Sequence, residues 1–285
     1  MMTRQVCLIT GATEGIGKAT AQALAGKGFT IVLAARNLAK AEATRSEIRA
    51  ATGTEDIDIV IGDLASLTQV RRMAEVVQMR HPTIDLLINN AGIMAPERRL
   101  TEDGLESSFQ VNYLSHLLLT QLLLGALEKS GQGRIINLGS SVYSIGAFDA
   151  RNLQSERRFS AIGAYAASKL FVLMSTIELG ERLRGTRITA NALNPGVVNT
   201  HMLKSATGLF KLIALLATPF AVSPEKGAAT SLYLATSPDV ATVSGGYFTN
   251  GRQEPVKSKS NTENNRALLW DFSMKALGLT GPASV

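Results

Sequence analysis

The sequence is poor in the residues that build disulfides and metal sites. Its 285 residues include one cysteine, Cys7, and three histidines, His81, His116 and His201. A single cysteine excludes an intrachain disulfide, and no cysteine or histidine pair has the spacing of metal ligands. The N-terminal run MMTRQVCLITG reaches a glycine too soon for a signal peptide or a spanning helix. We therefore expect a cytoplasmic protein that binds no metal, with Cys7 as a small core residue.

Strong charge is also lacking. The net charge is +6, and the basic residues are scattered rather than gathered among aromatic side chains. Nucleic-acid binding is therefore not expected, although a general attraction for anionic ligands remains open. With 45% hydrophobic and 18% charged residues, the composition is that of an ordinary globular protein.

Short β-rich runs alternate with helical patterns along most of the chain. Unbroken apolar strands between helices are typical of a parallel sheet that is covered on both faces. The sequence therefore predicts one doubly wound α/β domain of the Rossmann type over residues 1–285, with a mostly parallel sheet of about seven strands. The expected strands are QVCLIT, FTIVLAA, IDIVIG, IDLLINN, GRIINLGS, RITANALNP and GGYFTN, and the expected helices span 16–27, 38–51, 67–79, 105–129 and 166–183.

The pattern changes after Pro195. Residues 201–224 form an apolar insertion, in which GLFKLIALLATPFA is too short to span a bilayer and contains a lysine and a proline. We predict a lid over a substrate pocket, with a core helix or contact with a membrane surface as alternatives. Residues 252–285 form a C-terminal extension with a polar loop and a short helix at 268–277. Helices 105–127 and 166–183 carry apolar faces through which two copies could pair as a homodimer.

A glycine-rich turn follows the first strand in TGATEGIGKATAQAL. Gly11, Gly15 and Gly17 let the backbone approach a pyrophosphate at the N-terminus of the next helix. The spacing G-x-x-x-G-x-G differs from the common dinucleotide fingerprint. Such a turn can also be a simple loop, but its place between a strand and a helix favours phosphate binding. Arg36 ends the second strand, where an arginine accommodates the 2′-phosphate of NADP and an acid would bind the ribose of NAD. The simpler alternative is a solvent-exposed arginine that binds no ligand.

Tyr165 and Lys169 lie one helical turn apart in YAASK. Side chains at i and i+4 share a helix face, so the ammonium group can favour the phenolate form of the tyrosine. A tyrosine whose pKa is lowered from about 10 in this way is suited to exchange protons. Such pairs also occur by chance on amphipathic helices.

Together these motifs resemble the short-chain dehydrogenase/reductase family, from Gln5 to Asn250. Beside the glycine turn and YAASK, the resemblance is carried by GDL at Asp63, NNAG ending at Gly92, VN at Asn112, INLGS at Ser140 and NPGVVNT ending at Thr200. The order of the motifs on strand ends and helices makes the match specific. A gap of 25 residues between Ser140 and Tyr165 and the run SPEKGAATSLYLATSPDV resemble the retinol-dehydrogenase-like branch.

The resemblance implies a role for each matching residue. Tyr165 would be the acid/base, Lys169 would bind the cofactor ribose and act on Tyr165, Ser140 would bind the substrate oxygen with Ser141 as an alternative, and Asn112 would break its helix and hold a water. The residues that the resemblance assigns to cofactor binding are Gly11, Thr13, Glu14, Gly15, Ile16, Gly17, Arg36, Asn37, Asp63, Leu64, Asn90, Ala91, Gly92, Tyr165, Lys169, Pro195, Gly196, Val198 and Thr200.

The resemblance implies a reductase or dehydrogenase that acts on a carbonyl compound or an alcohol. Residues 143–163 and 201–224 would shape the substrate pocket, and their apolar content favours a small hydrophobic aldehyde, ketone or alcohol. Because of Arg36 we expect NADP(H) in preference to NAD(H), although Glu14 beside the glycines is unfavourable for an extra phosphate. Two other classes remain: a cofactor-sensing regulatory protein on the same fold, and an epimerase or dehydratase that uses the same tyrosine and lysine. A light-dependent pigment reductase fits a chain with one cysteine poorly.

Overall fold

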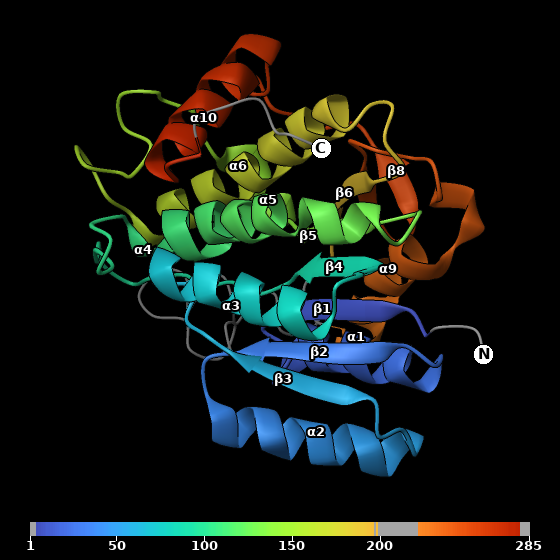
Figure 1. Cartoon of the computed structure of the whole chain (residues 1–285). Coiled ribbons are helices and arrows are strands. Elements are labelled where there is room, and N and C mark those ends of the chain that lie inside the picture. Colours follow the sequence, from blue (N-terminus) through green and yellow to red (C-terminus); the bar gives the residue numbers. More distant parts are fainter. Residues whose placement is uncertain (1–3, 197, 199–221, 280–285) are drawn as a thin grey trace.

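A single sheet of eight strands forms the centre of the protein. The computed structural model describes residues 4–196, 198 and 222–279. The strands lie in the order β3-β2-β1-β4-β5-β6-β7-β8, and all neighbours are parallel except β7 and β8 (Figure 1). The strands are β1 (Val6–Thr10), β2 (Thr30–Ala35), β3 (Ile57–Ile61), β4 (Leu86–Asn89), β5 (Arg134–Leu138), β6 (Thr189–Asn194), β7 (Tyr247–Thr249) and β8 (Arg252–Glu254).

The seven predicted strands are confirmed, and β8 adds one that the sequence analysis placed in a polar loop. Thr249 pairs with Arg252, so a two-residue turn of Asn250 and Gly251 joins β7 to β8. Both turn residues have positive φ, 51° for Asn250 and 72° for Gly251. An Asn-Gly pair in this conformation is the preferred two-residue hairpin turn, because its twist matches that of the strands.

Helices cover both faces of this sheet. They are α1 (Gly15–Gly26), α2 (Leu38–Thr52), α3 (Leu67–Arg80), α4 (Ser107–Phe109), the π-helical η1 (Gln110–Leu114), α5 (Ser115–Glu128), the 3-10 helix η2 (Ser141–Ile145), α6 (Ala161–Arg182), α9 (Pro224–Thr236), the 3-10 helix η4 (Pro238–Val240) and α10 (Glu263–Ala276). Helix α6 starts before the predicted residue 166, because the Ser160 side chain accepts a hydrogen bond from Gly163 N at 3.1 Å and caps it. Tyr165 therefore lies inside the helix.

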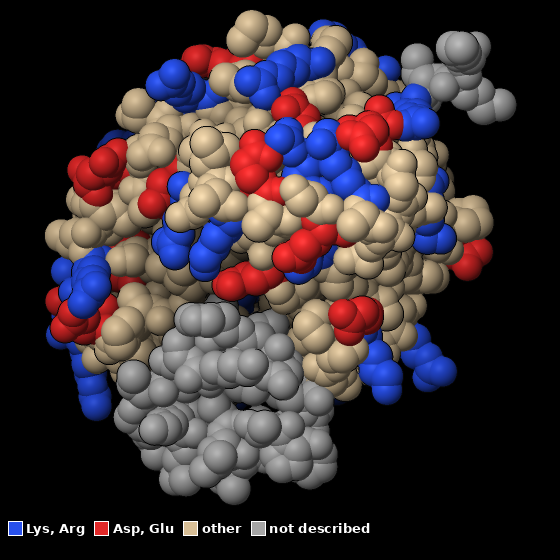
Figure 2. Space-filling model, turned by 90° about the horizontal axis from the view of Figure 1, so that it is seen from below, with Lys and Arg blue, Asp and Glu red and all other residues tan. Residues whose placement is uncertain are grey.

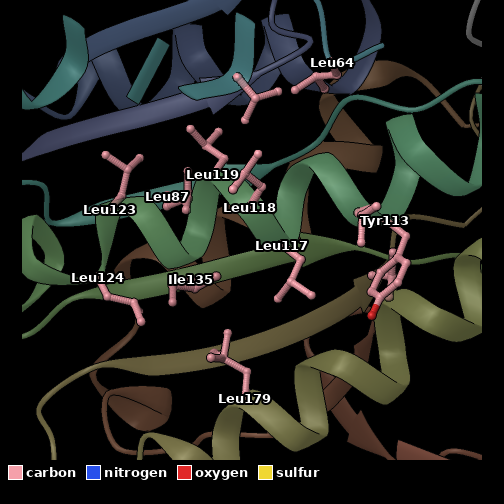
Figure 3. Close-up of a cluster of buried hydrophobic side chains, with 14 of the residues drawn as sticks. Leu64, Leu87, Tyr113, Leu117, Leu118, Leu119, Leu123, Leu124, Ile135 and Leu179 are labelled. Atoms are coloured by element: carbon pink, nitrogen blue, oxygen red, sulfur yellow. The ribbon is translucent and has the colours of Figure 1, made fainter. Parts of the chain in front are cut away.

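Two hydrophobic cores lie on the two faces of the sheet. One contains side chains of α3, α5, α6 and α10, and the other contains side chains of α1, α2 and α9 together with the buried Cys7. Figure 3 shows leucines leaving α5 in several directions, among them Leu118, Leu119 and Leu123. Burial on several sides explains why the sequence of α5 is apolar almost throughout rather than along a single stripe.

Helix α10 packs on the outer side of α6. The Tyr113 hydroxyl lies 2.7 Å from Ser273 Oγ, and the Arg182 guanidinium lies 4.6 Å from the centre of the Trp270 ring. The predicted helix at 268–277 thus begins earlier, at Glu263, and covers apolar surface of α6 and η1. The apolar faces from which we predicted a homodimer pack against other parts of the same chain. They therefore give no support to a homodimer, which stays a prediction.

Charge and hydropathy can be followed over the described part of the chain. Acidic and basic side chains are interspersed on the described part of the face that Figure 2 shows. Within the described residues, α6 is the one helix long and apolar enough to cross a membrane, but 61% of its apolar window is buried, as in the core helix of a globular protein. The predicted lid at 201–224 lies almost entirely outside the described residues.

Candidate active site

A cavity of about 740 Å³ lies at the carboxyl ends of the parallel strands. The strand order reverses between β1 and β4, and such a switch point is where open α/β sheets bind ligands. The cavity brings together predicted residues from positions up to 187 apart in the sequence, and Thr200 lies outside the described residues. The predicted residues that line it are Gly11, Thr13, Glu14, Gly15, Ile16, Gly17, Arg36, Asn37, Asp63, Leu64, Asn90, Ala91, Gly92, Ser140, Tyr165, Lys169, Pro195, Gly196 and Val198.

The glycine turn at the start of α1 leaves no room for side chains. A Cβ atom on Gly17 would lie 2.4 Å from the Gly11 carbonyl oxygen and 2.5 Å from Asn90 Nδ2. Gly11 and Gly15 have φ values of 63° and 55°, which only glycine adopts readily. The residue before the helix, Glu14, makes no capping hydrogen bond with its side chain. The backbone N–H groups of the first turn are thus accessible to an anion, and the turn fits the pyrophosphate of a dinucleotide.

Basic side chains line the part of the cavity beyond β2. Arg36 and Lys40 are exposed and flank the start of α2, and Asn37 Oδ1 caps that helix by accepting a hydrogen bond from Lys40 N at 2.9 Å. Glu14 lines the same cavity, and the predicted opposition between Arg36 and Glu14 stays a prediction. Lys40 was missed from the sequence, although its position one turn into the helix after Asn37 was a usable signal.

A hairpin beside the Asp63 corner was also missed. The Ser107 N–H donates to the Arg99 carbonyl at 3.0 Å, and Thr101 N–H donates to the Leu105 carbonyl at 2.8 Å. Arg99, Leu100, Thr101 and Ser107 therefore reach the cavity together with Asp63. The sequence of this segment has no periodicity, so only the tertiary structure could place it there.

The three residues with proposed chemistry meet at the β5 end of the cavity. The Lys169 Nζ lies 5.8 Å from the centre of the Tyr165 ring, as expected for one helical turn, and donates a hydrogen bond of 2.7 Å to the Leu138 carbonyl. Ser140 caps η2, and its side chain acts on the Tyr165 phenol by lowering its pKa, whereas Ser141 is exposed. The structure therefore favours Ser140 over Ser141 as the partner of Tyr165.

Burial controls the protonation of this pair, and here the sequence-based expectation was wrong. Burial raises the pKa of the Tyr165 phenol to about 12, although the Ser140 side chain has a smaller, lowering effect. Burial also lowers the pKa of Lys169 to about 8, because the ammonium group is held away from water. The expected decrease in the Tyr165 pKa depended on the spacing of the two residues and ignored the loss of hydration. At neutral pH, Tyr165 is a protonated phenol beside a charged lysine.

Asn112 lies behind the cavity rather than in its wall. It sits in the π-helical turn η1, so the predicted break in the helix is present. Its side chain is paired with Ile93, accepting from N at 2.7 Å and donating to O at 2.8 Å, and it also donates to Ser168 Oγ at 2.9 Å. Asn112 lines a second buried cavity of about 20 Å³, which has room for about one water molecule. The predicted water near Asn112 stays a prediction.

Comparison with known proteins gives the same assignment from the whole sequence. The model of the family described as short chain dehydrogenase matches residues 5–208. Human retinol dehydrogenase 13 is 39% identical over 286 residues, which cover 97% of this chain and 85% of that protein.

Solved structures agree with this assignment. An uncharacterized protein from Mycobacterium paratuberculosis has a TM-score of 0.78 and 32% identity, with 97% of this chain and 94% of the other covered. An actinorhodin polyketide ketoreductase solved with NADPH has a TM-score of 0.68 and 26% identity, with 87% and 97% covered.

Proposed function

The chain belongs to the short-chain dehydrogenase family, and from that premise we propose that it is an NADP(H)-dependent oxidoreductase that interconverts a hydrophobic aldehyde or ketone and its alcohol. The observation that carries the proposal is one cavity with two ends. A glycine turn suited to a pyrophosphate lies at one end, and Ser140, Tyr165 and Lys169 meet at the other. A bound reduced nicotinamide would supply the hydride.

The protein residues supply the proton and the polar contacts. Tyr165 donates its phenolic proton to the carbonyl oxygen of the substrate in the direction of reduction. Ser140 donates a hydrogen bond to the same oxygen and stabilises the negative charge that develops on it. The buried Lys169 ammonium keeps positive charge beside the phenol and is close enough to the cavity to hold ribose hydroxyls. Oxidation of the alcohol uses the same groups in reverse.

A regulatory protein or an epimerase would be less consistent with these observations. A cofactor sensor needs the glycine turn and Arg36 but has no use for three chemical groups gathered at the other end of the cavity. The similarity to dehydrogenases and a ketoreductase also covers most of each chain, without a large additional substrate domain.

The hydrophobic substrate class rests on two supports. The relatives include retinol dehydrogenases, which are named for a hydrophobic alcohol. Ile93 and Val142 line the cavity beside the chemical groups and offer apolar contacts. We therefore propose a hydrophobic substrate. We also propose a cytoplasmic location, with association at a membrane surface as the alternative. Fractionation of cells that express the protein would distinguish these two locations.

The preference for NADP(H) is proposed from the groups around the start of α2. Arg36 can hold a 2′-phosphate by charge-assisted hydrogen bonds, and Lys40 adds a second positive charge at the same end of the cavity. Glu14 opposes them with a repulsion of about 1 kcal/mol at several ångströms in water. Direct contact outweighs this more distant repulsion, so we expect a clear but moderate preference.

The test compares kcat/KM for NADPH and NADH with a panel of hydrophobic aldehydes and ketones. Loss of a charge-assisted hydrogen bond of about 1.5–3 kcal/mol in Arg36→Ala should lower the NADPH/NADH ratio by about tenfold or more. Glu14→Ser should raise the ratio a few-fold. Arg45→Ala removes a positive charge from the same helix outside the cavity and should leave the ratio unchanged. An unmutated protein that prefers NADH, or an unchanged ratio in Arg36→Ala, would refute the cofactor assignment.

A further inference from the structure

A buried histidine links the nucleotide end of the cavity to the π-helical turn. His116 is 5% exposed and is the second residue of α5, directly after η1. Its Nε2 lies 2.9 Å from Thr10 Oγ1 at the end of β1, and its Nδ1 lies 3.1 Å from the Asn112 carbonyl oxygen. The ring thus bridges two elements that are 102 residues apart in sequence and that both contribute to the site.

The hydrogen bonds of Thr10 determine which nitrogen of His116 carries the proton. Thr10 Oγ1 accepts one hydrogen bond from Asn90 N and another from Ala91 N, both at 3.0 Å. A hydroxyl oxygen has two lone pairs and one proton. Because both lone pairs are used, the proton of Thr10 must be donated to His116, so Nε2 is the acceptor and carries no hydrogen. The other nitrogen, Nδ1, then carries the hydrogen and donates it to the Asn112 carbonyl.

Only the neutral ring fits this arrangement. A protonated imidazole has N–H groups on both nitrogens, and Thr10 Oγ1 would then face three donors with two lone pairs. Burial agrees with this geometry, since it lowers the pKa of His116 to about 4 with a smaller contribution from the charge of Lys169.

Asn90 and Ala91 line the dinucleotide cavity, and the turn that they form is tightly packed. Asn90 Nδ2 also donates to the Thr10 and Gly11 carbonyls at 2.8 and 3.0 Å, and a Cβ on Gly11 would lie 2.8 Å from Ala91 Cα. A small movement of Thr10 would therefore shift the wall of the cavity at the glycine turn.

We propose that His116 is a positioning residue for cofactor binding: with its proton on Nδ1, it fixes the Thr10 hydroxyl and so holds the Asn90-Ala91 turn against the glycine turn. It acts through Thr10 and does not touch the cofactor. This inference rests on the proposed function, because it requires that the cavity binds a nicotinamide dinucleotide. It goes beyond the family resemblance, which assigns no role to this position.

The experiment measures the dissociation constant of NADP⁺ by calorimetry, which needs no turnover. His116→Leu removes both hydrogen bonds and should weaken binding by about tenfold, whereas His116→Gln can place an acceptor near Thr10 and should stay within about threefold of the unmutated protein. Thr10→Ser keeps the hydroxyl and should bind normally, and Thr10→Val should weaken binding by at least tenfold. The double variant Thr10→Val/His116→Leu should be no worse than Thr10→Val alone, because both changes remove one shared bond.

Thr120→Val is the matched control. Thr120 is a buried residue of the same helix, 2% exposed, and its hydroxyl accepts a hydrogen bond from the Asn89 side chain at 3.0 Å, whereas Thr10 accepts from the backbone N–H groups of Asn90 and Ala91. It should lower thermal stability without changing the dissociation constant. Three results would overturn the proposal. They are a Thr120→Val variant that binds NADP⁺ as weakly as Thr10→Val, a double variant whose losses in binding are additive, and a Thr10→Val variant with unchanged binding. If His116→Leu fails to fold, the Thr10 pair and His116→Gln decide. An unmutated protein that binds neither NADP⁺ nor NAD⁺ would instead refute the proposed function.

Discussion

Raising the pH above 8 should switch off carbonyl reduction by removing the proton of Lys169. Burial lowers the pKa of this lysine from 10.5 to about 8, while the pKa of Tyr165 is raised to about 12. The proton donor Tyr165 therefore stays protonated throughout the accessible range, and the charge beside it is what changes. About nine-tenths of the lysines are charged at pH 7 and about one-tenth at pH 9, so kcat/KM should fall about tenfold for each pH unit above 8.

The loss of activity above pH 8 cannot be explained by unfolding that results from the titration of Lys169, because the loss of the Lys169 proton stabilises the folded protein. Unfolding returns the lysine to its ordinary pKa of 10.5, so between pH 8 and 10.5 the unfolded chain binds the additional proton. Stability rises with pH wherever the unfolded state binds more protons, and a shift of this size corresponds to an increase of about 3 kcal/mol in the free energy of unfolding from Lys169. Activity should thus fall while this contribution to stability grows.

The assay measures kcat/KM for reduction with NADPH from pH 6 to 10 at constant ionic strength. The unmutated protein should show a falling limb near pH 8. Lys169→Gln should have a much lower plateau without this limb, and Lys129→Gln, which changes an exposed lysine at the end of α5, should retain both. A limb that persists unchanged in Lys169→Gln would refute the assignment to Lys169, and constant activity up to pH 10 would refute the lowered pKa.

Three further variants, the last with a matched control, test the site and the core. Tyr165→Phe should abolish turnover and leave NADPH binding within a few-fold, because the ring is kept and the proton donor is lost; retained turnover would remove Tyr165 from the mechanism. Gly17→Ala should lose cofactor binding in a fluorescence titration, since its Cβ would lie 2.4 Å from the Gly11 carbonyl oxygen; normal binding would show that the turn can open. Leu118→Ala, at a fully buried position, should lower the free energy of unfolding by about 2–5 kcal/mol in urea, whereas Met79→Ala, 76% exposed, should change it by less than about 0.5 kcal/mol.

Seven strands and most helix positions could be predicted because burial on both faces leaves a direct signature in the sequence. Unbroken apolar runs such as β2 and β4 have no other simple explanation in an alternating chain. Strand β8 is exposed at all three residues and has no such signature, so only the Asn250-Gly251 turn pointed to it. Helix α10 was predicted too short because its first turn is polar, and capping by Thr262 was the signal that was overlooked.

The site was predictable where motifs are contiguous and unpredictable where it depends on packing. The glycine turn and the Tyr165–Lys169 pair each lie within a few residues, so local spacing gives their geometry. The Arg99 hairpin and the bridge of His116 join positions that only the folded chain brings together. The predicted decrease in the Tyr165 pKa was wrong for the same reason. Spacing gives the distance to the lysine, but desolvation depends on everything else that surrounds the phenol.

The raised pKa of Tyr165 affects the two directions of the reaction differently. Reduction begins with a protonated phenol, which is the form that burial favours at neutral pH. Oxidation begins with the phenolate, and for a pKa of about 12 this form makes up only about one molecule in 10⁵ at pH 7. The desolvation that was absent from the sequence-based expectation thus keeps Tyr165 in the protonation state from which reduction starts. We expect efficient reduction at neutral pH, with the oxidation of alcohols rising as the pH increases from 6 to about 7.5, where a lysine with a pKa of about 8 still carries most of its charge.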